Sequence, residues 1–226
     1  MSIVLYHQAG PDKSAVDQVL KLVASFCTEL RLDAIPASNA FYSLYQWALV
    51  REVDLYIERI GHANAPAELL LAFDEVKRDE VVGFLLYLPV MSQPGACGVG
   101  YMAVKSSHQG CGIGKSLLVA MLDRHPHAEL TCSVSNVAFY ESMGFNVVGT
   151  HSSQVAMSTR TQATDGEILL IDSRSILGSA EARQRQMELE QRWGKKEMRY
   201  AIQQFQRHVS KLVHQTDSFV KERLGR

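Results

Sequence analysis

The sequence lacks both a long apolar run and closely spaced cysteines. No stretch reaches the length of about 18 uncharged apolar residues that a membrane span needs, and charged residues interrupt the first twenty positions, where a signal peptide would have its apolar core. The four cysteines (Cys27, Cys97, Cys111 and Cys132) include no Cys-x-x-Cys pair, which argues against a disulfide framework and a structural zinc site. We therefore expect a cytoplasmic protein with reduced thiols and no bound metal.

The net charge is also small, but it is unevenly distributed. The 226 residues are 46% hydrophobic and 21% charged, which is typical of a soluble globular protein, and their formal net charge is −1. Residues 181–226 nevertheless hold 11 Lys and Arg against 6 Asp and Glu, so the rest of the chain is acidic. The sequence predicts one domain over residues 1–178 and a basic, amphipathic helical extension over residues 179–226.

Hydrophobic periodicity and turn residues predict alternating strands and helices. Gly98 and Gly100 lie within an apolar strand, where glycine indicates a bulge or a close backbone approach. Ser135 and Asn136 are expected to cap a short helix that Gly144 ends. The expected elements are strands at 3–7, 68–73, 81–90, 97–104, 129–134, from 145 onward and at 168–171, and helices at 13–26, 36–60, from 115 onward and at 137–143.

A glycine-rich segment, His108-Gln-Gly-Cys-Gly-Ile-Gly-Lys115, joins an expected strand to an expected helix. Glycines at a helix start expose backbone N–H groups that can bind a phosphate, although a tight turn without a ligand would have the same composition. The segment fails the P-loop pattern because Gln109 stands where glycine is required, which disfavours an ATPase or GTPase. It also fails the G-x-G-x-x-G dinucleotide pattern, because Lys115 and Leu117 replace the last glycine.

The segment does satisfy a third pattern, [R/Q]-x-x-G-x-[G/A], over Gln109 to Gly114. Downstream, Asn136-Val-Ala-Phe-Tyr-Glu-Ser-Met-Gly-Phe145 is similar to the signature N-x-x-A-x-x-Y-x-x-x-G-F, with its tyrosine one place nearer. Upstream, Tyr101 to Val104 is similar to a strand that ends in valine just before the loop. With these motifs the sequence resembles the GCN5-related N-acetyltransferase (GNAT) family, closely over residues 80–150 and in strand order over about 1–175.

The resemblance implies an α/β fold with a mixed, mostly antiparallel, splayed sheet flanked by helices, followed here by the C-terminal helical extension. It implies an acyltransferase that uses acetyl-coenzyme A as co-substrate and transfers the acetyl group to a primary amine, on a small molecule or a protein, by direct attack. The backbone of Met102, Ala103 and Val104 would bind the pantetheine arm. The pyrophosphate would lie on the loop, whose residues are Gln109, Gly110, Cys111, Gly112, Ile113, Gly114 and Lys115.

The resemblance implies that Tyr140 is the catalytic residue and that Asn136 contacts the cofactor. A phenol, with a pKa near 10, stays neutral at pH 7 and can protonate the leaving thiolate. The sequence does not identify the general base: no carboxylate lies between residues 95 and 105, and the alternatives are Glu52, Asp54, Tyr101, an ordered water and deprotonation by solvent. The aromatic residues Phe41, Tyr42, Tyr45 and Trp47 fit either the acceptor pocket or the core.

The C-terminal extension carries a heptad seam over 198–219, formed by Met198, Ile202, Phe205, Val209, Leu212, Thr216 and Phe219. The seam predicts packing on the domain itself, on a second copy in a homodimer, or on a protein partner. Its basic residues permit nucleic-acid binding, but interspersed glutamates favour a solvated helix instead. Two other functions stay open: a non-catalytic scaffold that binds coenzyme A and recruits a partner through the helix, and an acyltransferase acting on aminoacyl-tRNA.

Overall fold

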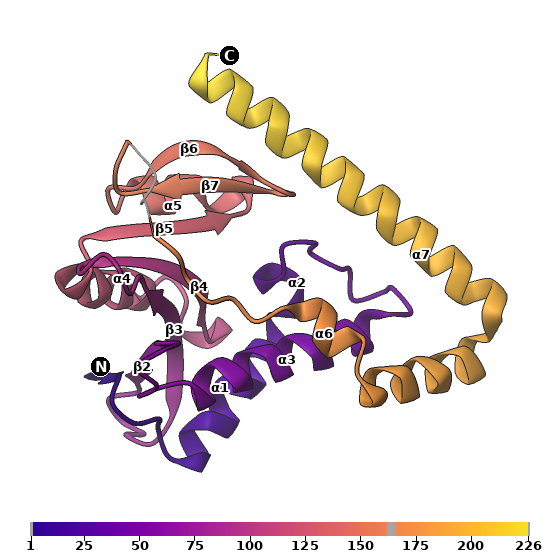
Figure 1. Ribbon diagram of the computed structural model, residues 1–226, viewed down its shortest axis with the longest axis horizontal. Coiled ribbons are helices and arrows are strands. Elements are labelled where there is room, and N and C mark those ends of the chain that lie inside the picture. Colours follow the sequence, from indigo (N-terminus) through magenta and orange to yellow (C-terminus); the bar gives the residue numbers. More distant parts are fainter. Residues whose placement is uncertain (1, 162–165, 226) are drawn as a thin grey trace.

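The computed structural model describes residues 2–161 and 166–225 (Figure 1). Within them, seven strands form one sheet in the order β1-β2-β3-β4-β5-β7-β6. Every neighbouring pair is antiparallel except β4 and β5, which run parallel. The strands are β1 (Ser2–Tyr6), β2 (Glu68–Phe73), β3 (Val81–Pro89), β4 (Ala96–Val104), β5 (His127–Cys132), β6 (Asn146–His151) and β7 (Gln154–Ser158).

Helices cover both faces of this sheet. α1 and α3 pack on one face, and α4 and α5 on the other (Figure 1). The central strands are buried on both sides: Leu69 and Leu71 of β2 face α1 and α3, whereas Leu70 faces α4, as the period of two in a strand requires. The helices are α1 (Lys13–Ser25), α2 (Cys27–Leu30), α3 (Tyr42–Glu58), α4 (Ile113–Arg124), α5 (Val137–Glu141), α6 (Ser173–Leu177) and α7 (Ala180–Leu224), with 3-10 turns at Ser106–His108 and Val134–Asn136.

The two parallel strands part soon after they meet. β4 and β5 pair only between Ala96–Gly98 and His127–Glu129, and beyond this point no pairing joins them. On its other side, β4 bulges at Gly100, because Leu86 pairs with Tyr101 and the next residue, Tyr87, pairs with Val99. The bulge expected from the strand glycines is confirmed. The expected fold class, a mostly antiparallel and splayed sheet flanked by helices, is confirmed as well.

One expected strand was wrong, and one strand was missed. Residues 168–171, expected as the last strand, form no strand but cross the sheet as an irregular segment (Figure 1). The last strand is β7, which sequence analysis missed and which inserts between β5 and β6. Apolar composition alone cannot tell the two segments apart, because a strand also needs a neighbour with free backbone groups.

The helix starts also differ from the expectation. α3 begins at Tyr42 rather than near Pro36, because Asn39 bonds its side-chain oxygen to the N–H of Phe41 and its amide to the backbone oxygen of Ala201. α2 was not expected. The expected side-chain cap at Ser135 and Asn136 is absent: Asn136 is the N-cap residue of α5, but its side chain makes no cap hydrogen bond.

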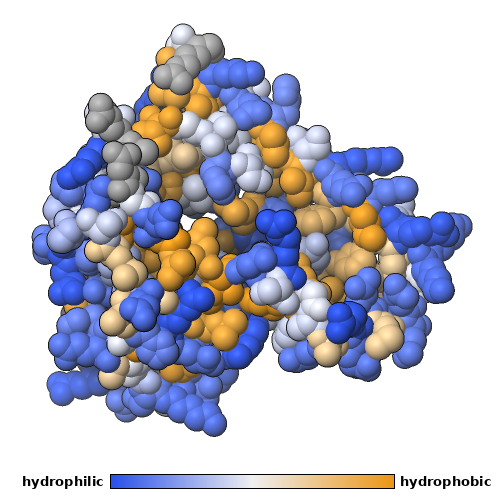
Figure 2. All heavy atoms as spheres, viewed as in Figure 1, coloured by the Kyte–Doolittle hydropathy of each residue, from blue (hydrophilic) through white to orange (hydrophobic). Residues whose placement is uncertain are grey.

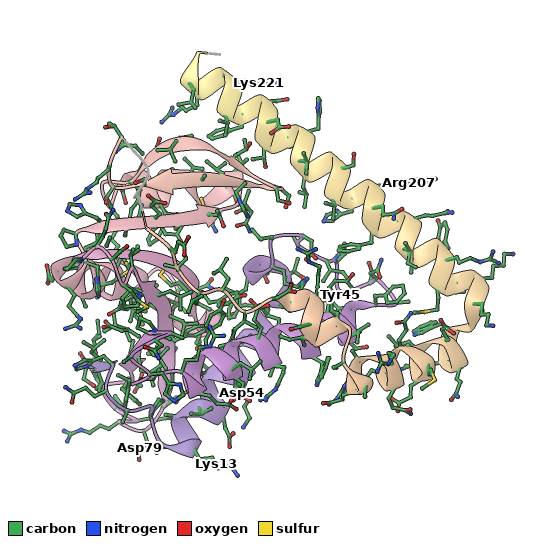
Figure 3. All side chains as sticks on the ribbon, in the orientation of Figure 1. Lys13, Tyr45, Asp54, Asp79, Arg207 and Lys221 are labelled. Atoms are coloured by element: carbon green, nitrogen blue, oxygen red, sulfur yellow. The ribbon has the colours of Figure 1, made fainter. Side chains whose placement is uncertain are left out.

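The long C-terminal helix α7 packs against its own chain. It bends at Gly194, whose φ of 79° and ψ of 153° are not helical, and then runs along one side of the molecule (Figure 1). Met198 and Thr216 of the heptad seam are buried, and the Phe205 ring lies 5.3 Å from that of Tyr45, whereas Ile202 is 42% exposed. Figure 3 shows Arg207 on the opposite, outer side of the helix.

The seam is thus occupied mainly within the chain. The division into residues 1–178 and 179–226 stays a prediction, as does a dimer. Among the described residues, no helix, α7 included, has a stretch apolar enough to span a bilayer.

Candidate functional site

A cavity of about 1470 Å³ lies where β4 and β5 part. Both strands line it, together with the loop that precedes α4, one side of α3 and the irregular segment from Gly166 to Ile171. Figure 2 shows apolar side chains gathered around the hollow at the centre of this face, where that segment crosses the sheet in Figure 1. The cavity therefore joins the sequence motifs around residues 101–115 and 136–145 to parts of the chain that sequence analysis did not assign to a site.

The glycine loop forms one wall of the cavity. Gly110 and Gly112 have φ values of +77° and +80°, and a Cβ atom at either position would meet nothing within 4 Å, so backbone conformation rather than crowding requires these glycines. Gly112 is the N-cap residue of α4 and has no side chain that could cap the helix. The N–H groups of the first turn, at Ile113, Gly114 and Lys115, thus have no partner within the helix and can bind an anion.

Gln109 fixes this loop to the strand before it. Its Nε2 donates a 3.0 Å hydrogen bond to the backbone oxygen of Val104. Cys111 and Lys115 are exposed, and Lys115 lines the cavity together with Gly110, Gly112, Ile113 and Gly114. Of the expected loop residues, all but Cys111 therefore line the cavity, with the side chain of Gln109 in a positioning role.

The edge of β4 forms the adjoining wall. Lys105 donates its N–H to Val82 on the β3 side, and backbone groups alternate in direction along a strand, so Met102 and Val104 direct theirs toward the gap beside β5. Pairing with β5 has already ended at Gly98. Ala103 directs its backbone toward β3, where it pairs with Phe84. The gap thus exposes a short strand edge to which an extended ligand can add.

Tyr140, on α5, also lines the cavity. It is 8% exposed, and its ring packs edge-on against those of Phe139 and Phe145. Burial raises the pKa of the Tyr140 phenol, so the hydroxyl is protonated at neutral pH. No described residue hydrogen-bonds to this hydroxyl, which leaves its proton available to a ligand. Asn136 is exposed at the cavity wall, free of the capping role.

A carboxylate and a phenol meet on the α3 side of the cavity. The hydroxyl of Tyr101 donates a 2.7 Å hydrogen bond to Oε1 of Glu52, and both residues line the cavity. Burial raises the pKa of Glu52, an effect that the hydrogen bond from Tyr101 and the positive charge of Arg31 partly offset. Of the candidate bases, Glu52 and Tyr101 are thus in the site. Asp54 instead pairs with Arg51 at 2.6 Å and does not line the cavity.

Two hydrogen bonds close the cavity on the side of β6 and β7. Ser153 donates its hydroxyl to the backbone oxygen of Leu32, and Nε2 of Gln154 donates to that of Arg31 at 3.4 Å. We call this connection, which joins Ser153 and Gln154 to Leu32 and Arg31, the roof. α7 holds it from outside, because Nε2 of His208 bonds the backbone oxygen of Ala34 at 3.0 Å. Sequence analysis missed the roof, since its two sides lie more than 100 residues apart along the chain.

The other residues considered from the sequence have structural roles. Of the aromatic residues Phe41, Tyr42, Tyr45 and Trp47, none lines the cavity: Phe41 is buried, Tyr45 contacts Phe205 of α7 (Figure 3), and Trp47 lies under Arg185 of α7. His125 contacts Glu68 at 3.4 Å and His127 accepts a 2.6 Å bond from Arg160. Within the part of the chain that the structure describes, no group of three metal-ligating side chains is found.

Comparisons with known proteins agree with this geometry. Residues 65–147, from just before β2 into β6, match the sequence profile of the acetyltransferase (GNAT) domain. No curated protein matches the sequence significantly.

Solved structures resemble the fold at low sequence identity. The PaiA N-acetyltransferase of Thermoplasma acidophilum, solved with coenzyme A, is 18% identical with a TM-score of 0.53, over 70% of this chain and 98% of that one. An acyl-CoA N-acyltransferase from Pseudomonas aeruginosa is 15% identical with a TM-score of 0.50, over 70% and 99%. A histone acetyltransferase HPA2-related protein of Corynebacterium glutamicum is 18% identical with a TM-score of 0.50, over 73% and 99%. The fold is therefore GNAT-like, and the segment 65–147, which holds the β4 edge, the glycine loop and Tyr140, matches the GNAT acetyltransferase domain.

Proposed function

We propose that this chain transfers the acetyl group of acetyl-coenzyme A to a primary amine. The observation that carries the proposal is the junction of three features in one cavity: the anion-binding loop before α4, the open edge of β4, and the protonated hydroxyl of Tyr140. The match of residues 65–147 to the acetyltransferase domain and the coenzyme A in the Thermoplasma structure support the choice of ligand.

The residues present fit this ligand. The pyrophosphate would lie on the N–H groups of Gly110 to Lys115, where nothing fills the space beside Gly110 and Gly112, and the dipole of α4 favours its charge. The pantetheine arm would run along β4 and bond the outward backbone groups of Met102 and Val104. Lys115 adds a positive charge at the loop, and Asn136 also lines the cavity.

The chemistry requires two proton movements. Acetyl-coenzyme A supplies an acetyl thioester, whose carbonyl carbon gains a bond to the amine nitrogen as its bond to sulfur breaks. Tyr140 gives its hydroxyl proton to the departing sulfur. Because burial raises the pKa of the phenol, that proton is present at neutral pH when the thiolate forms. Glu52 takes the proton that the amine loses, and its raised pKa makes it a better acceptor than an exposed carboxylate.

The first experiment measures acetyl-coenzyme A binding by calorimetry. Cys111→Glu places a negative charge in the loop without altering a glycine, and Cys111→Gln places a side chain of the same shape without the charge. We expect wild type and Cys111→Gln to bind with similar affinity and Cys111→Glu to bind about tenfold more weakly or worse, because like charges repel strongly at short range. Absence of binding by the wild type would overturn the proposal, and binding without turnover of any amine would favour the scaffold alternative.

A further inference from the structure

The cavity has an apolar end beyond the Glu52–Tyr101 pair. Its walls there are side chains of α3, of the end of β3 and of the irregular segment: Leu49, Tyr56, Leu88, Val90, Ile168 and Leu170. This end lies on the α3 side of the sheet, away from the glycine loop and α4. The amine acceptor, whose nitrogen must reach Glu52, would therefore extend its remaining atoms over this surface.

The irregular segment is anchored, although it belongs to no regular element. The N–H of Ile171 donates a 2.9 Å bond to the hydroxyl of Tyr56, and Nη1 of Arg59 donates a 2.9 Å bond to the backbone oxygen of Leu169. Ile168 packs on Gly98, where a Cβ atom would come within 2.9 Å of its Cδ1. The segment thus keeps a defined position over β4.

Although the irregular segment is anchored, it leaves an apolar side chain exposed at the mouth of the cavity. Leu170 lines the cavity and is 66% exposed, although backbone bonds on either side of it fix the segment. Leu169 is also exposed, at 56%, but does not line the cavity. An exposed apolar side chain at the rim of a pocket gains free energy when an apolar ligand covers it. Leu170 is therefore in the position to contact the body of an acceptor.

The charges at this end favour a cation and disfavour an anion. Of the described residues that line the cavity, only Arg31 and Lys115 carry a lysine or arginine side chain, and Lys115 belongs to the glycine loop. Arg31 is occupied: its guanidinium makes two 2.7 Å hydrogen bonds to Asp33 and lies 4.6 Å from the centre of the Tyr45 ring. A carboxylate on the acceptor would find no free cation here and would be repelled by Glu52.

We propose, on the basis of the proposed function, that the acceptor is a primary amine on an apolar body without an acidic group, such as an alkylamine or an arylalkylamine. Its ammonium group binds at Glu52 and loses one proton to solvent, and Glu52 takes the second proton as the neutral amine attacks and the carbon–nitrogen bond forms. Its apolar body lies between Tyr56 on α3 and Leu170 on the irregular segment. This acceptor class satisfies both the carboxylate of Glu52 and the apolar walls beyond it.

Matched pairs of amines test the proposal by thiol release from acetyl-coenzyme A. Phenethylamine and phenylalanine differ by one carboxylate, and hexylamine and 1,6-diaminohexane differ by one additional amino group. We expect kcat/KM to be at least tenfold higher for the first member of the phenyl pair and no lower for hexylamine than for the diamine. Higher kcat/KM for phenylalanine, for the diamine or for a lysine-containing peptide would overturn the inference.

Two variants of neighbouring leucines locate the acceptor. Leu170→Asn should raise the KM for phenethylamine several-fold while the affinity for acetyl-coenzyme A stays unchanged. Leu169→Asn, at a residue that is also exposed but lies outside the cavity, should leave both unchanged. Equal effects of the two variants would contradict the assigned position. If acetyl-coenzyme A binds and no amine of the panel is acetylated, the acceptor class is wrong; if acetyl-coenzyme A does not bind, the proposed function itself fails.

Discussion

The hydroxyl of Thr216 on α7 donates a 2.8 Å hydrogen bond to the backbone oxygen of Ser153, in the turn between β6 and β7. Ser153 in turn bonds the backbone oxygen of Leu32, so the helix supports the roof of the cavity from outside. Thr216 is 2% exposed, and water cannot replace its hydroxyl. α7 therefore contributes to the shape of the site through a residue that touches no substrate.

Replacing Thr216 by valine should destabilise the protein and loosen the roof. Valine keeps the shape but leaves the carbonyl of Ser153 without its partner, which costs about 1–3 kcal/mol. Urea unfolding measures the loss, and the KM for the amine should rise while acetyl-coenzyme A binding stays the same. Thr216→Ser, which retains the hydroxyl, is the control and should lose less. Equal free energies of unfolding for the valine variant and the wild type would show that this hydrogen bond does not stabilise the fold.

Removing the hydroxyl of Tyr140 should slow catalysis without affecting cofactor binding. Tyr140→Phe keeps the ring contacts with Phe139 and Phe145, so the fold of α5 should be preserved. Loss of a general acid lowers kcat by a factor on the order of 10² to 10⁴. Thiol release and calorimetry measure the two effects separately. Tyr200→Phe, on the exposed side of α7, is the matched control; an active Tyr140→Phe enzyme would remove Tyr140 from the reaction.

The Glu52–Tyr101 pair predicts an acid limb in the pH profile of kcat/KM. Glu52 accepts a proton only when ionised, and its pKa is raised above 4.5 by burial, so activity should fall as the pH decreases through that raised value. The hydrogen bond from Tyr101 lowers the pKa of Glu52. Tyr101→Phe should therefore move the limb to higher pH, and Glu52→Gln should abolish it.

The acceptor amine has its own titration near pH 10, and this provides an internal control. That alkaline feature should persist in both variants, because it belongs to the substrate. An acid limb unchanged in Glu52→Gln would assign the base to another group or to solvent.

Local features of this fold could be predicted from local sequence. Gly110 and Gly112 are needed because the backbone enters the left-handed region at both residues, and Gly100 marks a bulge in β4. These requirements depend on the residue itself and its neighbours. The amino-acid sequence alone was therefore enough to locate the glycine loop, the strand that precedes it and the position of Tyr140.

Features that depend on distant partners could not be predicted in this way. Glu52 and Tyr101 lie 49 residues apart, and their contact depends on how α3 packs on β4. Residues 168–171 have the composition of a strand, but their backbone bonds go to Tyr56 and Arg59 rather than to a neighbouring strand. Apolar composition is compatible with a strand, whereas tertiary packing decides whether the segment pairs with a neighbouring strand.

A buried carboxylate far from the glycine loop predicts a pH-dependent stability. Burial alone would raise the pKa of Glu68, but hydrogen bonds from His125, Arg124 and Tyr87 outweigh it and hold the pKa at about 2, below the ordinary value of 4.5. A carboxylate whose pKa is lowered by folding stabilises the native state fully above its unfolded pKa. That contribution is lost as the pH falls through the native value.

The free energy of unfolding of the wild type should therefore decrease between about pH 4.5 and pH 2, with a contribution from Glu68 on the order of 3 kcal/mol. Glu68→Gln lacks this contribution, so its stability should be lower at pH 7 and should change less over the acid range. Urea unfolding of both proteins from pH 7 to pH 3 measures the difference. Parallel curves for the two proteins would mean that Glu68 titrates normally and that its hydrogen bonds to β3 and α4 do not favour the ionised form.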